Sequence, residues 1–132
     1  MSYRFLEHTG ELGLEVEAPS LEELLNEAAR AFAELTAAGQ SGEAAVRSIE
    51  LKTEDERTLF ADWLNELVFL ADTDGFVPER LLFLERKGVS LRAAIEGFQG
   101  APRPIVKAVT YHDLELKEDL REGWKARVVL DV

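Results

Sequence analysis

Apolar and polar residues alternate near the start of the chain. Leu12, Leu14 and Val16 are separated by single glycine or glutamate residues, and the segment 3–5 has the same spacing. A period of two places successive side chains on opposite faces of a strand. The pattern predicts two half-buried strands that are joined through residues 8–11.

The next segment has a helical period. Ser20 and Glu23 have the spacing of a capping box, and apolar residues then recur every three or four positions as far as Leu35. Gly39 follows at the place where a glycine commonly ends a helix. The pattern predicts an amphipathic helix over residues 20–38.

A second helical segment surrounds Trp63. Its apolar residues cover a broader arc than those of the first helix, which indicates deeper burial and favours a core position for Trp63. The spacing from Thr53 to Glu56 predicts a second capping box, and the helix is expected to end in a turn over 72–75.

The remaining apolar runs alternate and predict strands. One starts at Ile49, and the others cover 81–85, 89–96, 105–111 and 125–132. Strands that accompany only two amphipathic helices predict a two-layer α+β sandwich with a largely antiparallel sheet. A chain of 132 residues, 46% of them hydrophobic, has room for one domain over residues 1–132.

The amino-acid composition excludes several classes of site and indicates where the protein is located. The chain has no cysteine, so disulfides, thiolate zinc sites and cysteine nucleophiles are excluded, and a reducing cytoplasm is the expected location. No signal-peptide core and no apolar run of membrane-spanning length is present, so no membrane association is expected. Scarce Asn and Gln beside abundant Glu and Arg favour a thermophilic source.

Acidic residues outnumber basic ones by 26 to 15, which gives a formal net charge of -11. A phosphate backbone would be repelled on average, so tight direct binding of nucleic acid is not expected. The charge suits a partner protein with a basic face, or it serves solubility alone.

The common catalytic motifs are missing. Two histidines cannot form a three-histidine zinc centre, and the chain has no phosphate loop, no nucleophile elbow and no HExxH motif. Asp72-Thr73-Asp74-Gly75 resembles the start of a calcium loop, but Val77 and Phe83 stand where such a loop needs glycine and glutamate. A solvated turn is the better interpretation, and the protein is not expected to be an enzyme.

Two acidic residues stand out. Glu11 lies between Gly10 and Gly13, in a short segment where a side chain should be exposed, and the period of two points Asp131 away from the apolar face of its strand. Each carboxylate is either a solvated surface charge or part of a site. Spacing alone cannot bring them together, because 120 positions separate them.

Several segments resemble those of one known family, the archeases, in the family's order and from end to end of the chain. They are Phe5 to Gly13, Trp63 to Leu67, Asp72 to Phe76, Val106 to His112 and Ala126 to Val132. The resemblance implies an accessory protein, not itself a catalyst, that activates an RtcB-type tRNA-splicing RNA ligase. That ligase joins an RNA 3′-phosphate (or 2′,3′-cyclic phosphate) to a 5′-hydroxyl. The accessory protein promotes guanylylation and multiple turnover of the ligase, to which the GTP and Mn²⁺ belong.

The resemblance also implies a site for a divalent cation, typically Ca²⁺, made by Glu11, Asp131 and the main-chain oxygen of Val132. Oxygen ligands suit such a hard cation. Glu11 stands where the family usually has aspartate, and its extra methylene lengthens the arm by about 1.5 Å. Lys107 and His8 are the residues expected to act on the partner. Lys107 shares the face of apolar neighbours in the period-two pattern, so it either extends past them to solvent or serves a functional edge.

Two other classes of function remain open at this point. One is a chaperone-like modulator of tRNA methyltransferases or other RNA-modifying enzymes. The other is a free-standing metal-dependent hydrolase, which is the weakest reading because no general base or nucleophile is evident.

Overall fold

The computed structural model describes residues 2–8, 10–37, 41–102 and 106–132. The elements in chain order are β1 (Ser2–His8), β2 (Glu11–Ala18), α1 (Leu21–Ala37), β3 (Glu43–Lys52), α2 (Glu56–Asp74), β4 (Phe76–Lys87), β5 (Ser90–Gln99), β6 (Ala108–Asp119) and β7 (Gly123–Asp131).

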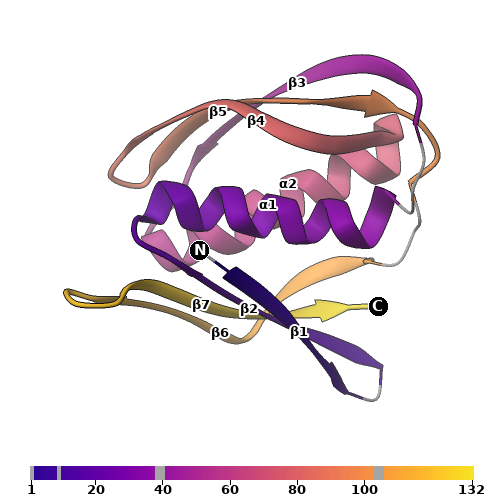
Figure 1. Ribbon diagram of the computed structural model, residues 1–132. Coiled ribbons are helices and arrows are strands. Elements are labelled where there is room, and N and C mark those ends of the chain that lie inside the picture. Colours follow the sequence, from indigo (N-terminus) through magenta and orange to yellow (C-terminus); the bar gives the residue numbers. More distant parts are fainter. Residues whose placement is uncertain (1, 9, 38–40, 103–105) are drawn as a thin grey trace.

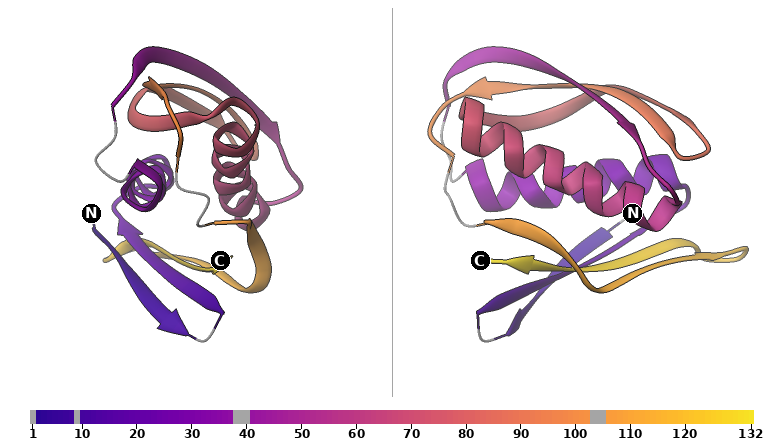
Figure 2. Two further views of the ribbon diagram at one scale, coloured as in Figure 1. Left: turned by 90° about the vertical axis from the view of Figure 1, so that its right-hand side faces the viewer. Right: turned by 180° about the vertical axis from the view of Figure 1, so that it is seen from behind.

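The strands form two sheets, and the helices lie between them (Figures 1 and 2). One sheet has four strands in the order β1-β2-β7-β6, the other has three in the order β3-β5-β4, and neighbouring strands are antiparallel. The α+β class, with antiparallel strands around two helices, is confirmed. The division into two sheets was not predicted, because a strand with one apolar face shows the same alternation whichever sheet it joins.

Helix α1 begins with the predicted capping box. The Glu23 amide donates to the Ser20 hydroxyl at 3.1 Å, and that hydroxyl donates to the Glu23 carboxylate at 3.0 Å. Leu24 and Leu25 are fully buried. The predicted stop at Gly39 lies outside the described residues.

The predicted cap of α2 is wrong by two residues. Asp55, not Thr53, precedes the helix, and its carboxylate accepts a hydrogen bond from the Thr58 amide at 2.7 Å. This bond lowers the pKa of the Asp55 carboxyl group. Thr53 instead donates its hydroxyl to the main-chain oxygen of Asp55 at 2.8 Å, which orders the turn that leads into the helix.

Helix α2 continues through Asp74, so the expected turn over 72–75 is its last turn. Gly75 ends it in the left-handed conformation, with φ at 64°, and its amide bonds to Ala71 at 3.1 Å. A side chain at Gly75 would place a Cβ 2.7 Å from the carbonyl oxygen of Gly100. The position therefore requires glycine for its conformation and for its space.

Trp63 lies in the core, as predicted, with 0% of its surface exposed. Trp124 is partly buried and packs against the same core. No helix in the described part of the chain combines the length and the apolar character that crossing a membrane requires.

Strand β6 differs most from the predicted strand over 105–111. It begins at Ala108, which leaves Lys107 just outside it, and it continues to Asp119. Its register against β7 shifts between Thr110 and Glu115, and Asp113 has a φ of 56° there. Such a bulge interrupts the alternation of faces, which explains why the pattern failed to show the second half of the strand.

Candidate functional site

Glu11 on β2 and Asp131 on β7 are direct partners across the two antiparallel strands. Residues directly opposite each other in such a pair point to the same face of the sheet. Both side chains are exposed, whereas Leu130, on the opposite face, is 2% exposed. The register thus brings together two carboxylates that the sequence keeps 120 positions apart. We call Glu11 and Asp131 the acidic pair.

The neighbouring strands add the other residues of interest. His8 on β1 is the strand partner of Glu11, and Ala108 on β6 is that of Asp131. The Lys107 amide donates to the Asp131 carbonyl at 2.8 Å, and the Lys107 side chain is exposed. The side chain of His8 lies outside the described part of the chain. The end of β1, the start of β2, the end of β7 and the start of β6 share one side of the molecule, on the right in Figure 1.

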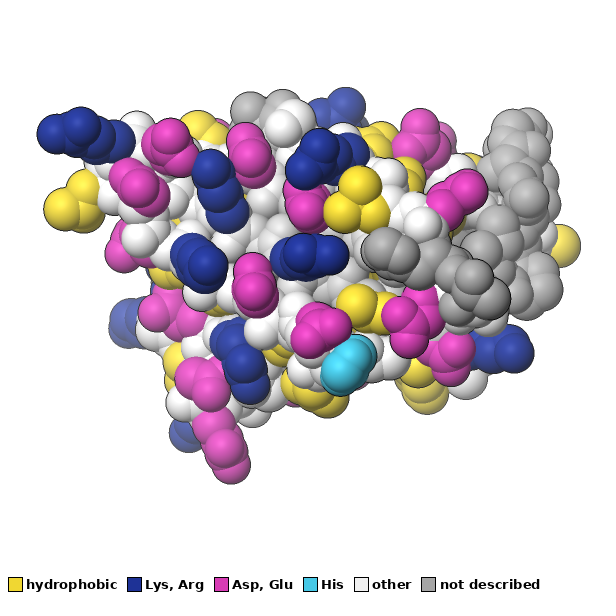
Figure 3. Space-filling view, turned by 90° about the horizontal axis from the view of Figure 1, so that it is seen from below, with side chains coloured by type: hydrophobic (Ala, Val, Ile, Leu, Met, Phe, Trp, Pro, Cys, Tyr) yellow, Lys and Arg dark blue, Asp and Glu magenta, His cyan; other side chains and the backbone are white. Residues whose placement is uncertain are grey.

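Glu11 and Asp131 lie on the face of the four-stranded sheet that points away from the helices. Elsewhere on this face, acidic and basic side chains alternate (Figure 3). The ion pairs are Arg4 with Glu15 at 2.6 Å, Lys125 with Glu17 at 4.0 Å, and Lys117 with Glu115 at 4.0 Å. The acidic pair, in contrast, forms no ion pair within the part of the chain that the structure describes. Two like charges directly opposite each other across a sheet are unfavourable. A bound cation or a basic group of a partner would relieve this repulsion.

The carboxylates of the acidic pair are oxygen ligands of the kind that an exposed metal site could use. Two carboxylates on adjacent strands suit a hard cation such as Ca²⁺ better than zinc or copper. No group of three or more His, Asp or Glu side chains that could hold a metal occurs among the described residues. A cation bound here would therefore need main-chain oxygen and water for most of the six to eight ligands that Ca²⁺ takes.

Helix α2 holds the outer side of β6, and the sequence did not show this. The Asn65 side chain donates to the carbonyl of Val109 at 3.2 Å and accepts from the amide of Val109 at 2.9 Å. Further along, Tyr111 donates its hydroxyl to the Asp62 carboxylate, and this hydrogen bond is the main reason why the pKa of Tyr111 rises to about 12. The available signal was a polar Asn65 within the apolar arc of the helix.

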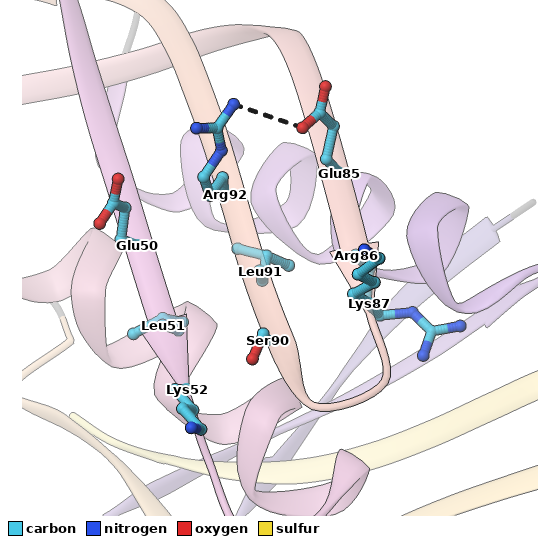
Figure 4. Close-up of a pocket in the computed structure, with 9 residues that line it drawn as sticks. All are labelled: Glu50, Leu51, Lys52, Glu85, Arg86, Lys87, Ser90, Leu91 and Arg92. Atoms are coloured by element: carbon cyan, nitrogen blue, oxygen red, sulfur yellow. Dashed lines mark hydrogen bonds and ion pairs between the residues drawn. The ribbon is translucent and has the colours of Figure 1, made fainter.

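A hollow of about 700 Å³ lies on the three-stranded sheet, near the turn between β4 and β5 (Figure 4). Lys52 and Lys87 stand on either side of Ser90, and Arg92 bonds to Glu85 at 3.4 Å. This hollow is in the other sheet, so it is separate from the acidic pair.

Comparison with known proteins agrees with the resemblance of the sequence. The model of the Archease protein family matches residues 3–132. Protein archease of Methanosarcina acetivorans is 37% identical over 141 residues, covering 98% of this chain and 95% of the relative. Protein archease of Archaeoglobus fulgidus is 32% identical over 139 residues, covering 100% of both.

Solved structures share the fold. The solution structure of Methanobacterium thermoautotrophicum protein 1598 has a TM-score of 0.74 and 31% identity, and the match covers 98% of each chain. The crystal structure of a Thermotoga maritima protein, described as an archease and possible chaperone, has a TM-score of 0.71 and 26% identity. That match covers 96% of this chain and 94% of the other. With a family match over nearly its whole length, the chain belongs to the archease family.

Proposed function

We propose that this protein is a non-catalytic activator of an RtcB-type tRNA-splicing RNA ligase. It promotes guanylylation of the ligase's histidine and allows repeated turnover, while GTP and Mn²⁺ are bound by the ligase. Membership of the archease family supports this proposal. A reducing cytoplasm is the proposed location, which suits a chain without cysteine.

The observation that carries the proposal is the acidic pair, which forms no ion pair with the side chains that the structure describes. Every other acidic residue named above on that face has a cation within 4.0 Å, but Glu11 and Asp131 face solvent together. Guanylylation depends on where a metal sits relative to nucleotide phosphates. Two exposed carboxylates that reach into the ligase's cleft can shift that metal or orient the histidine nucleophile.

Lys107 complements the carboxylates. The Lys107 amide donates to the carbonyl of Asp131, so the exposed Lys107 side chain extends from the same end of the sheet as the acidic pair. A lysine there can contact a phosphate of GTP or of the RNA end as a point charge. We include His8, the strand partner of Glu11, in the surface that meets the ligase.

We also propose that the acidic pair binds Ca²⁺, with the main-chain oxygen of Val132 as a third ligand. Bound Ca²⁺ would neutralise the repulsion between the two carboxylates and fix their directions. The longer arm of Glu11 is the feature of this chain that bears most directly on its affinity.

The test is a turnover assay. The purified protein is added to its cognate ligase with GTP, Mn²⁺ and an RNA that carries a 3′-phosphate, and ligated product per ligase molecule is counted. We expect about one turnover without the protein and many turnovers with it. Equal turnover with and without the protein would contradict the proposal.

A second candidate is a chaperone-like role toward tRNA methyltransferases or other RNA-modifying enzymes. The Thermotoga maritima relative is described as a possible chaperone. This chain also exposes apolar side chains on β3 and β4, with Val46 at 52%, Leu82 at 45% and Phe83 at 44% exposure. Suppression of methyltransferase aggregation, lost in Phe83→Ser and kept in Asp131→Ala, would favour this role over ligase activation.

A further inference from the structure

We infer that Asn65 is a positioning residue that acts through Lys107. The inference rests on the proposed function, in which the exposed Lys107 side chain acts on the ligase. Asn65 would fix the position of the main chain that carries this side chain. The hydrogen bonds of the Asn65 side chain are made with Val109 and not with the acidic pair. Asn65 acts on the main chain of Val109, two residues beyond Lys107.

The contact between Asn65 and Val109 takes the place of the hydrogen bonds that a neighbouring strand would make with Val109. β6 is the last strand of its sheet, so the polar groups on its outer side have no neighbouring strand to bond. Asn65 supplies both missing partners to one residue, with bonds of 3.2 Å and 2.9 Å. A carboxamide has a donor and an acceptor side by side, whereas aspartate can only accept and alanine can do neither.

The segment around Lys107 is held at three points. Val106 is buried in the core at 5% exposure, the Lys107 amide bonds to the Asp131 carbonyl at 2.8 Å, and Asn65 fixes Val109. An exposed lysine that only improves solubility needs no such support. A main chain held from the core, from β7 and from α2 is what a charged group needs if it must act at a defined place.

Hydrogen exchange tests the physical part of the inference and needs no ligase. In Asn65→Ala the Val109 amide loses its acceptor, so we expect it to exchange at least about fivefold faster, and the Lys107 amide to follow. Asn26→Ala, the same change on α1, is the matched control. Unchanged exchange at Lys107 in a folded Asn65→Ala protein would overturn the inference.

A double-mutant cycle tests the functional part. Asn65→Ala should lower the rate of ligase guanylylation by roughly five- to tenfold, and Lys107→Ala should lower it further. In the Lys107→Ala background the Asn65 change should then cost less than about twofold, because the residue it positions is gone. Losses that multiply fully in the double variant, or full activation by Lys107→Ala, would contradict the inference.

Asn65→Asp serves where Asn65→Ala folds poorly. It keeps the size and the acceptor for the Val109 amide but loses the donor to the Val109 carbonyl. We expect slow exchange at Val109 and an intermediate rate of guanylylation, and rates equal to the parent in both measurements would count against the inference. If the parent protein activates no ligase, the proposed function fails, and the exchange experiment still decides whether Asn65 holds Lys107.

Discussion

Trp63 on α2 donates its indole N–H to the main-chain carbonyl of Leu25 on α1, at 2.8 Å inside the core. Trp63→Phe removes this donor and part of the buried ring. We expect the free energy of unfolding to fall by about 2 to 3 kcal/mol, measured by urea denaturation. Trp124→Phe, at the partly exposed tryptophan, is the control and should cost less. An equal loss in both variants would show that the bond between the helices contributes little.

Asp131→Ala and Glu11→Ala should separate activation from stability. Both side chains face solvent, so the free energy of unfolding should change by less than about 0.5 kcal/mol, while acceleration of ligase guanylylation is lost. Glu17→Ala, on the same strand and face as Glu11, should leave activation intact. If both acidic variants fold and still activate fully, the working part lies elsewhere, with Lys107 the next residue to change.

Calorimetric titration with Ca²⁺ tests the cation site. We expect binding by the parent protein and its loss in Glu11→Gln and in Asp131→Asn, because each change removes one negative ligand. Glu11→Asp, which shortens the arm to the length usual in the family, should bind Ca²⁺ more tightly than the parent. Binding that survives both neutral substitutions would place the cation somewhere else.

Tyr111 gives the protein a pH dependence at alkaline pH. Its pKa lies at about 12 in the folded protein, first because its hydroxyl donates to Asp62, and near 10 when unfolded. The unfolded chain therefore loses this proton first, so stability is fully present below about pH 10 and falls as the pH rises toward 12. Ultraviolet titration of tyrosinate should show a late transition that Tyr111→Phe removes, while the transition of Tyr3, whose pKa burial also raises, remains. Unfolding with the same alkaline pH dependence in Tyr111→Phe would contradict this reading.

Binding of RNA by the isolated protein should be weak. With a net charge of -11, the protein repels a phosphate backbone on average and gains little from the release of its counterions. A fluorescence titration with tRNA near physiological salt should give no saturable complex in the micromolar range. A tight complex that weakens steeply as salt is raised would refute this prediction.

Strand faces could be predicted where alternation is unbroken. Leu130 is buried and Asp131 exposed, as a period of two requires. The pairing of Asp131 with Glu11 could not be predicted from spacing, because a register between strands far apart in the chain depends on the packing of the whole sheet. The bulge in β6 was missed because it breaks the period on which the prediction rests.

Residues that act through hydrogen bonds to the main chain also could not be identified from the sequence. Asn65 lies within an apolar helix face, and its sequence neighbours say nothing about which strand it meets. Asp55 was overlooked as the cap of α2 because Thr53 and Glu56 have the spacing of a capping box, although the aspartate is closer to the helix and caps it directly.

The order of strands in the four-stranded sheet also governs when the acidic pair comes into existence. β7, the last strand that the structure describes, lies between β2 and β6, so neither neighbour can complete its pairing before β7 arrives. During synthesis, Glu11 is made early, and 120 further residues must be added before Asp131 is present. A nascent or truncated chain without β7 presents a lone glutamate on a hairpin that is only marginally stable by itself. The proposed engagement of a partner by the acidic pair would thereby depend on completion of the fold.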